Sequence, residues 1–241
     1  MATSTELRSR RAISTSTTAL GPLTSSRLLL RSYTPDDAEP VFDAIEETRL
    51  SLLRWVPDIG SRSTVLEVRS GLTSLITAAA NHRKHIVFGI WEPSSERFLG
   101  EVGLYSVDLQ RGVGELGYWL RQGARGNGYV SEAARMLVAY ARSTVRLRRI
   151  EAHVAAENLP SRRVVERLGF VVASHRRPAP QWDGTVGDVL IYALPARHLR
   201  EPSGISKGRR VFGFAPRHAG AATGRHPARP PAPICPTARV A

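Results

Sequence analysis

The sequence predicts a mixed α+β domain in which a central, mostly antiparallel sheet of about seven strands packs against about four helices. Three observations predict this class. Short β-rich runs alternate with amphipathic segments in the order β-α-α-β-β-β-α-β-α-β-β, three of the strands follow one another through turns, and no internal repeat is present. With 241 residues and 42% apolar side chains, the chain can bury a sizeable core.

The first half of the domain should contain one strand, two helices and a meander. Residues 25–33 alternate as a strand, and the Thr-Pro-Asp-Asp segment 34–37 supplies the N-cap, proline and acidic first turn of a helix to about Thr48. Helical spacing recurs from Val65 to Ala80. The meander strands are expected at residues 85–91, 98–107 and 112–120.

The second half should add two helices and three strands. A helix is expected over residues 131–142 and a strand over 149–154. Asn158 opens a shorter helix that stops at Gly169, because glycine commonly follows the last turn of a helix. The closing strands are expected at 170–173 and 186–194, on either side of a turn at Trp182-Asp183-Gly184.

The formal charge of +13 lies mainly outside this pattern. Residues 1–20 carry +2 and residues 196–241 carry +8, which leaves +3 for the part between them. Because the Pro-, Ala- and Arg-rich tail cannot bury enough apolar surface to order itself, we predict a disordered extension over 1–21, one domain over 22–195 and a disordered basic tail over 196–241. A solvated tail without a partner is the leading interpretation, and nucleic acid binding is expected only through it.

Composition also excludes several classes of function. No apolar run approaches the roughly eighteen residues of a membrane span, and the first twenty residues lack the apolar core of a secretory signal. We therefore expect a cytoplasmic monomer or homodimer without a membrane partner. The single cysteine, Cys235, lies in the tail, so neither an internal disulfide nor a cysteine nucleophile is expected in the domain. No metal site is expected.

The most informative segment is a glycine-rich turn between a predicted strand and a predicted helix. Arg125-Gly126-Asn127-Gly128 follows the alternating run that ends at Leu120 and precedes the helix. Glycines let backbone N–H groups turn toward a ligand, and the positive end of the helix dipole adds to their attraction for an anion. The turn is therefore a predicted phosphate-binding site.

Two other glycine patterns do not predict nucleotide chemistry. The segment 112–117 spells Gly-x-Gly-x-x-Gly, but its glycines interleave with a strand and no helix begins after them. A phosphate loop of the nucleotidase type requires Lys and Ser or Thr after its last glycine, whereas Tyr129 and Val130 follow Gly128. Neither a dinucleotide cofactor nor nucleotide hydrolysis is predicted.

Several segments together resemble the GCN5-related N-acetyltransferase (GNAT) superfamily. Its Arg/Gln-x-x-Gly-x-Gly/Ala motif falls on residues 125–130, with Val130 in place of the last Gly or Ala. The Glu-Leu-Gly-Tyr-Trp-Leu segment 115–120 and the segment 158–170 are similar to the ribosomal-protein N-terminal acetyltransferase (RimJ/RimL-like) branch, as are 27–31 and 34–38. The resemblance covers about residues 25–194 and implies a GNAT fold.

The resemblance implies that acetyl-CoA is the co-substrate and that the acetyl group moves directly to an amine within a ternary complex. Backbone N–H groups of the turn would bind the diphosphate with help from the charge of Arg125, and a backbone N–H around Tyr118 to Leu120 would stabilise the oxyanion. Asn158 would contact the pantetheine arm. The implied cofactor residues are Tyr118, Trp119, Leu120, Arg125, Gly126, Asn127, Gly128, Tyr129, Val130, Asn158 and Ser161.

Acetyl transfer also needs a neutral amine and a proton for the leaving thiolate. An α-amino group titrates near 7.7–8.0, so a weak base suffices; Glu115, through water, and His153 are the candidates. The superfamily often places a tyrosine acid where this chain has Val165, which leaves Ser161 to hydrogen-bond the sulfur or relay a proton. Each candidate also has a purely structural interpretation. Glu115 is then a charge at a strand edge and His153 a packed polar side chain. Asn158 and Ser161 are then the cap and a first-turn residue of the helix.

The leading interpretation is an N-acetyltransferase whose acceptor is a primary amine, most simply a protein N-terminal α-amine. A small-molecule amine is the first alternative acceptor. The second alternative is a degenerate acetyltransferase-fold module that docks on RNA through the basic tail. The sequence does not choose among the acceptors.

Overall fold

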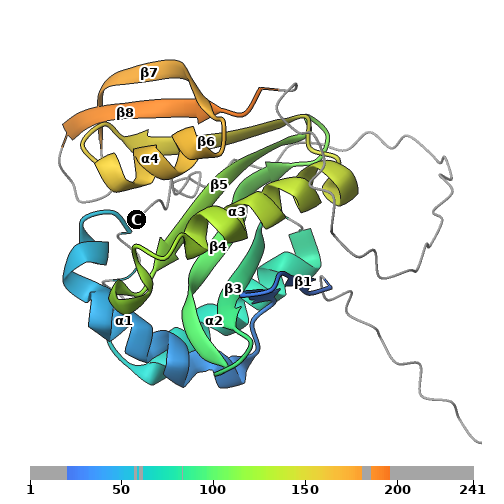
Figure 1. Cartoon of the computed structure of the whole chain (residues 1–241), viewed down its shortest axis with the longest axis vertical. Helices are drawn as coiled ribbons and strands as arrows, with labels where there is room; N and C mark the ends of the chain where they lie inside the picture. Colours follow the sequence, from blue (N-terminus) through green and yellow to red (C-terminus); the bar gives the residue numbers. More distant parts are fainter. Residues whose placement is uncertain (1–20, 57–58, 60–61, 83, 181–185, 196–241) are drawn as a thin grey trace, which may run out of the picture.

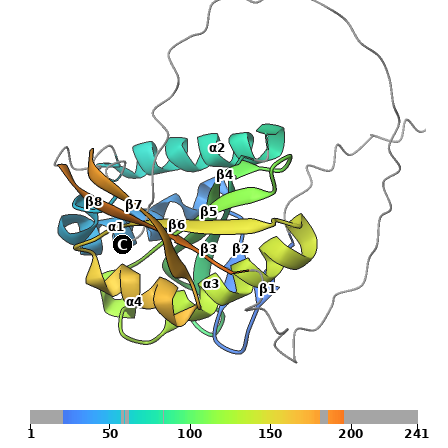
Figure 2. The same ribbon diagram turned by 90° about the horizontal axis from the view of Figure 1, so that it is seen from above.

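A computed structural model describes residues 21–56, 59, 62–82, 84–180 and 186–195. Within these ranges one sheet lies between two pairs of helices (Figures 1 and 2). Helices α1 (Ala38–Leu53) and α2 (Val65–His82) cover one face, and α3 (Tyr129–Tyr140) and α4 (Leu159–Arg167) cover the other. The predicted Trp182-Asp183-Gly184 turn, residues 1–20 and the basic tail lie outside the described ranges.

The sheet has eight strands in the order β1-β2-β3-β4-β5-β6-β8-β7. All neighbours are antiparallel except β5 and β6, so the predicted mixed, mostly antiparallel architecture is confirmed. The strands are β1 (Leu23–Thr24), β2 (Leu29–Arg31), β3 (Ile86–Glu92), β4 (Arg97–Asp108), β5 (Val113–Leu120), β6 (Arg149–Ala155), β7 (Val171–Pro180) and β8 (Val186–Ala193).

The strand predicted over residues 25–33 is shorter in the structure, because residues 25–28 form a turn and only β2 falls within the predicted range. Strand β1 lies just before that range and is the eighth strand. The Ser25 N–H donates to the Leu28 carbonyl at 2.9 Å, and the Leu28 N–H donates to Ser25 Oγ at 3.0 Å. An apolar/polar alternation continues across such a turn, so it does not reveal the break. Helix α1 also runs past Thr48 to Leu53, because buried Leu52 extends the same helical face by another turn.

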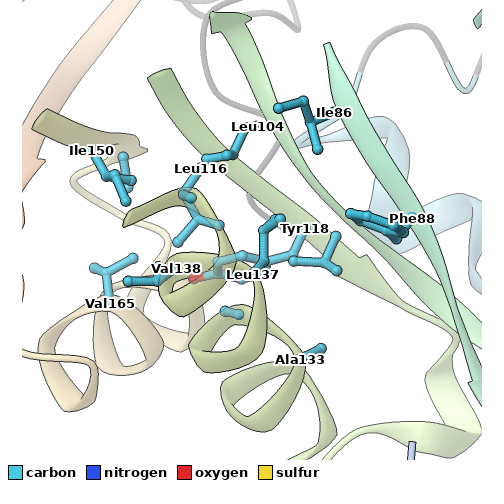
Figure 3. Close-up of a cluster of buried hydrophobic side chains, with 14 of the residues drawn as sticks. Ile86, Phe88, Leu104, Leu116, Tyr118, Ala133, Leu137, Val138, Ile150 and Val165 are labelled. Carbon is cyan, nitrogen blue, oxygen red and sulfur yellow. The ribbon is translucent and has the colours of Figure 1, made fainter. Parts of the chain in front are cut away.

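Two apolar cores fill the layers on either side of the sheet. Alternate residues of each strand point to opposite faces, so Leu116, Tyr118 and Leu120 of β5 pack beneath α3 and α4 (Figure 3). Trp119 belongs to the other core, under α1 and α2. By the same alternation, Glu115 points to the α1/α2 face of the sheet.

The described residues show neither a membrane-spanning helix nor a cluster of metal ligands. None of their helices combines the length and apolar content that crossing a bilayer requires. Nor do they gather three or more His, Cys, Asp and Glu side chains in a group that could hold a metal ion.

Candidate active site

The candidate site is built where β5 and β6 stop pairing. Their parallel ladder consists of Val113↔Arg149, Gly114↔Ile150 and Glu115↔Glu151, and there it ends. Beyond Glu151, strand β6 continues alongside β8. The predicted segment Tyr118 to Leu120 therefore lies on a stretch of β5 that has β4 but not β6 as its neighbour. Its backbone groups on the β6 side have no strand partner to satisfy them.

The glycine turn leads from β5 into α3, as predicted. Gly126 and Gly128 have φ angles of 81° and 75°, and a Cβ added at either would meet no heavy atom within 4 Å. The Glu132 N–H donates to the Gly128 carbonyl at 3.1 Å, and the N–H groups of residues 126–131 donate to no acceptor among the described residues. Open space and unpaired donors at the positive end of a helix suit an anion.

Two side chains of the motif stabilise the turn. Asn127 Nδ2 donates to the carbonyls of Ala124 and Arg125 at 3.3 and 3.1 Å. Arg125 lies toward α1, where its guanidinium donates to the Leu120 carbonyl at 3.3 Å and to Ser51 Oγ at 3.0 Å. Burial lowers the pKa of this partly exposed arginine. The side chain expected at the phosphates is therefore engaged with α1 and the end of β5.

The start of α4 lies across from β5 on the α3/α4 face. Asn158 caps the helix, its Oδ1 accepting the Ser161 N–H at 3.2 Å, which is the structural role that the sequence left open. Both residues are buried, and Ser161 Oγ has no hydrogen-bond partner among the described residues. The Tyr118 hydroxyl donates to the Ser161 carbonyl at 3.0 Å, so it ties α4 to β5 beyond the end of the β5–β6 ladder.

The two candidate bases lie side by side on the α1/α2 face. Glu115 Oε1 is 3.6 Å from His153 Nδ1, and His153 Nε2 is 3.1 Å from Glu151 Oε2. Glu115 and His153 keep only 6% and 8% of their surface exposed. Burial raises the pKa of Glu151, but hydrogen bonds from Arg149 and His153 outweigh it, so its pKa is lowered and it remains a carboxylate. An imidazole flanked by two carboxylates is suited to accept a proton.

Sequence reasoning missed part of this polar face. Glu151 appeared only as a residue of a predicted strand, although its parity with His153 would have placed the two side chains on one face. Nearby, the carboxylate of buried Glu101 accepts the hydroxyls of Tyr33 at 3.0 Å and Tyr105 at 2.6 Å. Burial raises the pKa of Tyr33, as does the adjacent Glu101. Tyr105 pairs with Glu115 across β4 and β5, which extends the buried polar row toward the candidate base.

The predicted residues thus form two groups, one on each face of the sheet. The turn, Asn158 and Ser161 lie on the α3/α4 side, while Glu115 and His153 lie on the α1/α2 side. The Trp119 side chain is buried in the α1/α2 core, so only its backbone can take part. The free N–H groups and the unpartnered Ser161 hydroxyl fit the diphosphate and the thiol end of a coenzyme A.

Comparison with known proteins identifies the family. The sequence model of the Acetyltransferase (GNAT) domain matches residues 27–171, more than half of the chain. The chain belongs to this family. It is an acetyl-CoA-dependent N-acetyltransferase of the GNAT fold. The RimJ/RimL-like resemblance is confirmed as well, because ribosomal-protein acetyltransferases are among its relatives and structural neighbours.

Three similar proteins illustrate this GNAT kinship. The uncharacterized N-acetyltransferase p20 of Bacillus licheniformis is 27% identical over 178 residues, which span 73% of this chain and 96% of that protein. The [ribosomal protein uS5]-alanine N-acetyltransferase of Escherichia coli is 26% identical over 71% of this chain and 89% of its own. The structure of Mycobacterium smegmatis RimJ in complex with CoA-disulfide is 27% identical, with a TM-score of 0.67 over 75% of this chain and 88% of that one.

Proposed function

We propose that this N-acetyltransferase acetylates protein N-terminal α-amines by direct transfer in a ternary complex, with His153 and Glu115 as the proton-accepting groups. The observation that carries the proposal is the buried Glu115–His153–Glu151 row beside the last pair of the β5–β6 ladder. It places a candidate base next to the point where β5 and β6 stop pairing. The described residues contain no cysteine, which supports a route without a covalent enzyme intermediate.

Glu151 supports His153 as the base by fixing its tautomer. With the Nε2–H donating to the Glu151 carboxylate, Nδ1 keeps its lone pair and faces Glu115. A proton leaving the acceptor nitrogen can then pass to Nδ1, directly or through Glu115. The negative charges of Glu115 and Glu151 stabilise the imidazolium that results. An α-amine needs only this modest help, whereas a lysine side chain, with a pKa near 10.4, needs far more.

The residues on the opposite face hold the co-substrate. Bound acetyl-CoA supplies an acetyl thioester, whose carbon–sulfur bond is exchanged for the new carbon–nitrogen bond. We assign the diphosphate to the N–H groups of residues 126–131 and the pantetheine arm to the neighbourhood of Asn158. The unpartnered Ser161 hydroxyl would hydrogen-bond the departing sulfur and relay a proton from water. N–H groups of residues 118–120 would stabilise the carbonyl oxygen as it gains charge.

The relatives support a ribosomal-protein N-terminus as the acceptor. The Escherichia coli relative is named for the alanine of ribosomal protein uS5, and other relatives are named for ribosomal proteins as well. At about a quarter identity this likeness motivates the acceptor class, and we extend it to this chain as a proposal. The cytoplasm, where ribosomal proteins are made, is the matching location.

An acceptor panel tests the proposal. Peptides with a free Ala or Ser N-terminus, the same peptides with a blocked N-terminus and one internal lysine, and small polyamines are assayed at pH 7.5 by thiol release. We expect the free N-termini to react at least about a hundredfold faster than the blocked peptides, because far more of the α-amine is neutral. Faster acetylation of a polyamine than of every peptide would replace the protein acceptor with a small-molecule acceptor.

A further inference from the structure

A second arginine, Arg27, lies outside the glycine motif but contacts the glycine turn and the start of α3. Arg27 lies between β1 and β2, and its Nε donates to Glu132 Oε2 at 3.0 Å. Its Nη2 bonds the same carboxylate and its Nη1 donates to the Asn127 carbonyl at 3.3 Å. The guanidinium also lies 5.1 Å from the centre of the Tyr129 ring. One side chain thus contacts the turn and the first turn of α3 at three points.

The contact of Arg27 with Glu132 matters because the charge of Glu132 would affect diphosphate binding. It lies in the first turn of α3, where a carboxylate stabilises the empty helix but repels a bound diphosphate. Burial raises the pKa of Glu132, but hydrogen bonds from Ser25 and Arg27 outweigh it, so the pKa is lowered and the group stays ionised. Ser25 Oγ donates to the other carboxylate oxygen at 2.6 Å. The β1–β2 turn therefore holds this charge with hydrogen-bond donors on both oxygens.

We propose that Arg27 is a positioning residue of the diphosphate site, which neutralises Glu132 and fixes the Asn127 carbonyl so that the N–H groups of the turn face the ligand. The arrangement of elements supports an indirect role. Helix α3 lies between α4 and β1 (Figure 2), and Arg27 reaches the turn and Glu132 from the segment between β1 and β2. The inference rests on the assignment of the diphosphate to residues 126–131 proposed above.

Coenzyme A binding by titration calorimetry tests the inference without a catalytic readout. Arg27→Gln should raise the Kd about tenfold, because it leaves an ionised carboxylate without its arginine partner beside the diphosphate. The double variant Arg27→Gln/Glu132→Gln should recover affinity to within about threefold of the wild type, since the repelling charge is gone. Arg27→Lys keeps the charge and should bind better than Arg27→Gln.

Two controls distinguish this role from the loss of a positive charge alone and from loss of the fold. Arg111→Gln makes the same charge change on a side chain that is 83% exposed, at the opposite end of β5, and should leave the Kd unchanged. Thermal melting of each variant without ligand checks that the fold is retained. A folded Arg27→Gln variant with wild-type affinity, or a double variant as weak as Arg27→Gln, overturns the role of Arg27. If Gly128→Asp also binds normally, the site assignment itself fails, which is a different result.

Discussion

The glycine turn and the Glu115–His153–Glu151 row differ in the groups that would carry out their proposed roles. The turn offers backbone N–H groups at an exposed surface, and its glycines matter for the side chains they lack. The row offers side chains, all on one face of the sheet, and Glu115 and His153 are buried. Backbone donors tolerate many neighbouring sequences, whereas a side-chain row requires particular residues at particular positions.

This contrast separates binding from chemistry. Changes in the turn should alter the affinity for coenzyme A, because we assign to the turn the diphosphate, which is far from the reacting thioester. Changes in the row should alter the rate of acetyl transfer at nearly constant affinity. A variant in either region that altered both quantities equally would contradict the division.

The largest expected effect is that of a charge placed in the turn. Gly128→Asp should weaken coenzyme A binding about a hundredfold, because the new carboxylate would occupy the anion site. Gly128→Asn is the matched control: it has nearly the same shape and tolerates the observed φ of 75°, so it should cost no more than about threefold. Calorimetry measures both Kd values. Equal losses for the two variants would mean that shape rather than charge governs the turn.

Neutralising the base should give the next largest effect, on rate alone. Glu115→Gln and His153→Gln should each lower kcat about a hundredfold, the usual contribution of a positioned base, with the Kd for coenzyme A unchanged. Glu39→Gln, at an exposed position in the first turn of α1, serves as the control. Steady-state kinetics with an α-amine peptide make the measurement. If kcat is retained in both variants, the row has no catalytic role.

Glu151 should change the pH dependence more than the maximal rate. Its lowered pKa means that its carboxylate is ionised throughout an assay range of about pH 6 to 9, and that its stabilising contribution is lost only as the pH falls through that lowered value. Glu151→Gln removes this charge, so the imidazolium is less stable and the acid limb of kcat/KM against pH should move to lower pH. The expected change in kcat is only severalfold. An unmoved acid limb would separate Glu151 from the base.

The smallest expected effect tests the Tyr118 hydroxyl, which ties α4 to β5. Tyr118→Phe leaves the Ser161 carbonyl without its donor and should lower the free energy of unfolding by about 1–2 kcal/mol, measured by urea denaturation. Burial raises the pKa of Tyr118, so the hydroxyl remains a donor and the loss should be the same at pH 7 and pH 9. Tyr129→Phe is the control, because its hydroxyl makes no hydrogen bond within the described part of the chain. A pH-dependent loss would assign the hydroxyl a titrating role.

Local features of the site were predictable where the signal lies in neighbouring residues. The turn at residues 125–128 and the cap at Asn158 follow from glycine conformation and helix-end chemistry, which act over a few residues. The contact of Arg27 with Glu132 was not predictable, since 105 positions separate the two residues. The orientation of the Arg125 side chain was not predictable either, because it depends on Ser51 of α1, which is distant in the sequence. The proposed domain limits of 22–195 remain a prediction.

The sequence by itself determined the order of the helices and strands apart from β1, the glycine turn that precedes α3 and the kind of chemistry, because periodicity, glycine placement and helix caps are local properties. Only the tertiary structure decided which side chains meet. The parallel pairing of β5 with β6 sets Glu115 opposite Glu151, and its end after this pair leaves His153 beside them. The register between strands far apart in the chain is fixed by the packing of both apolar cores, which no short segment encodes.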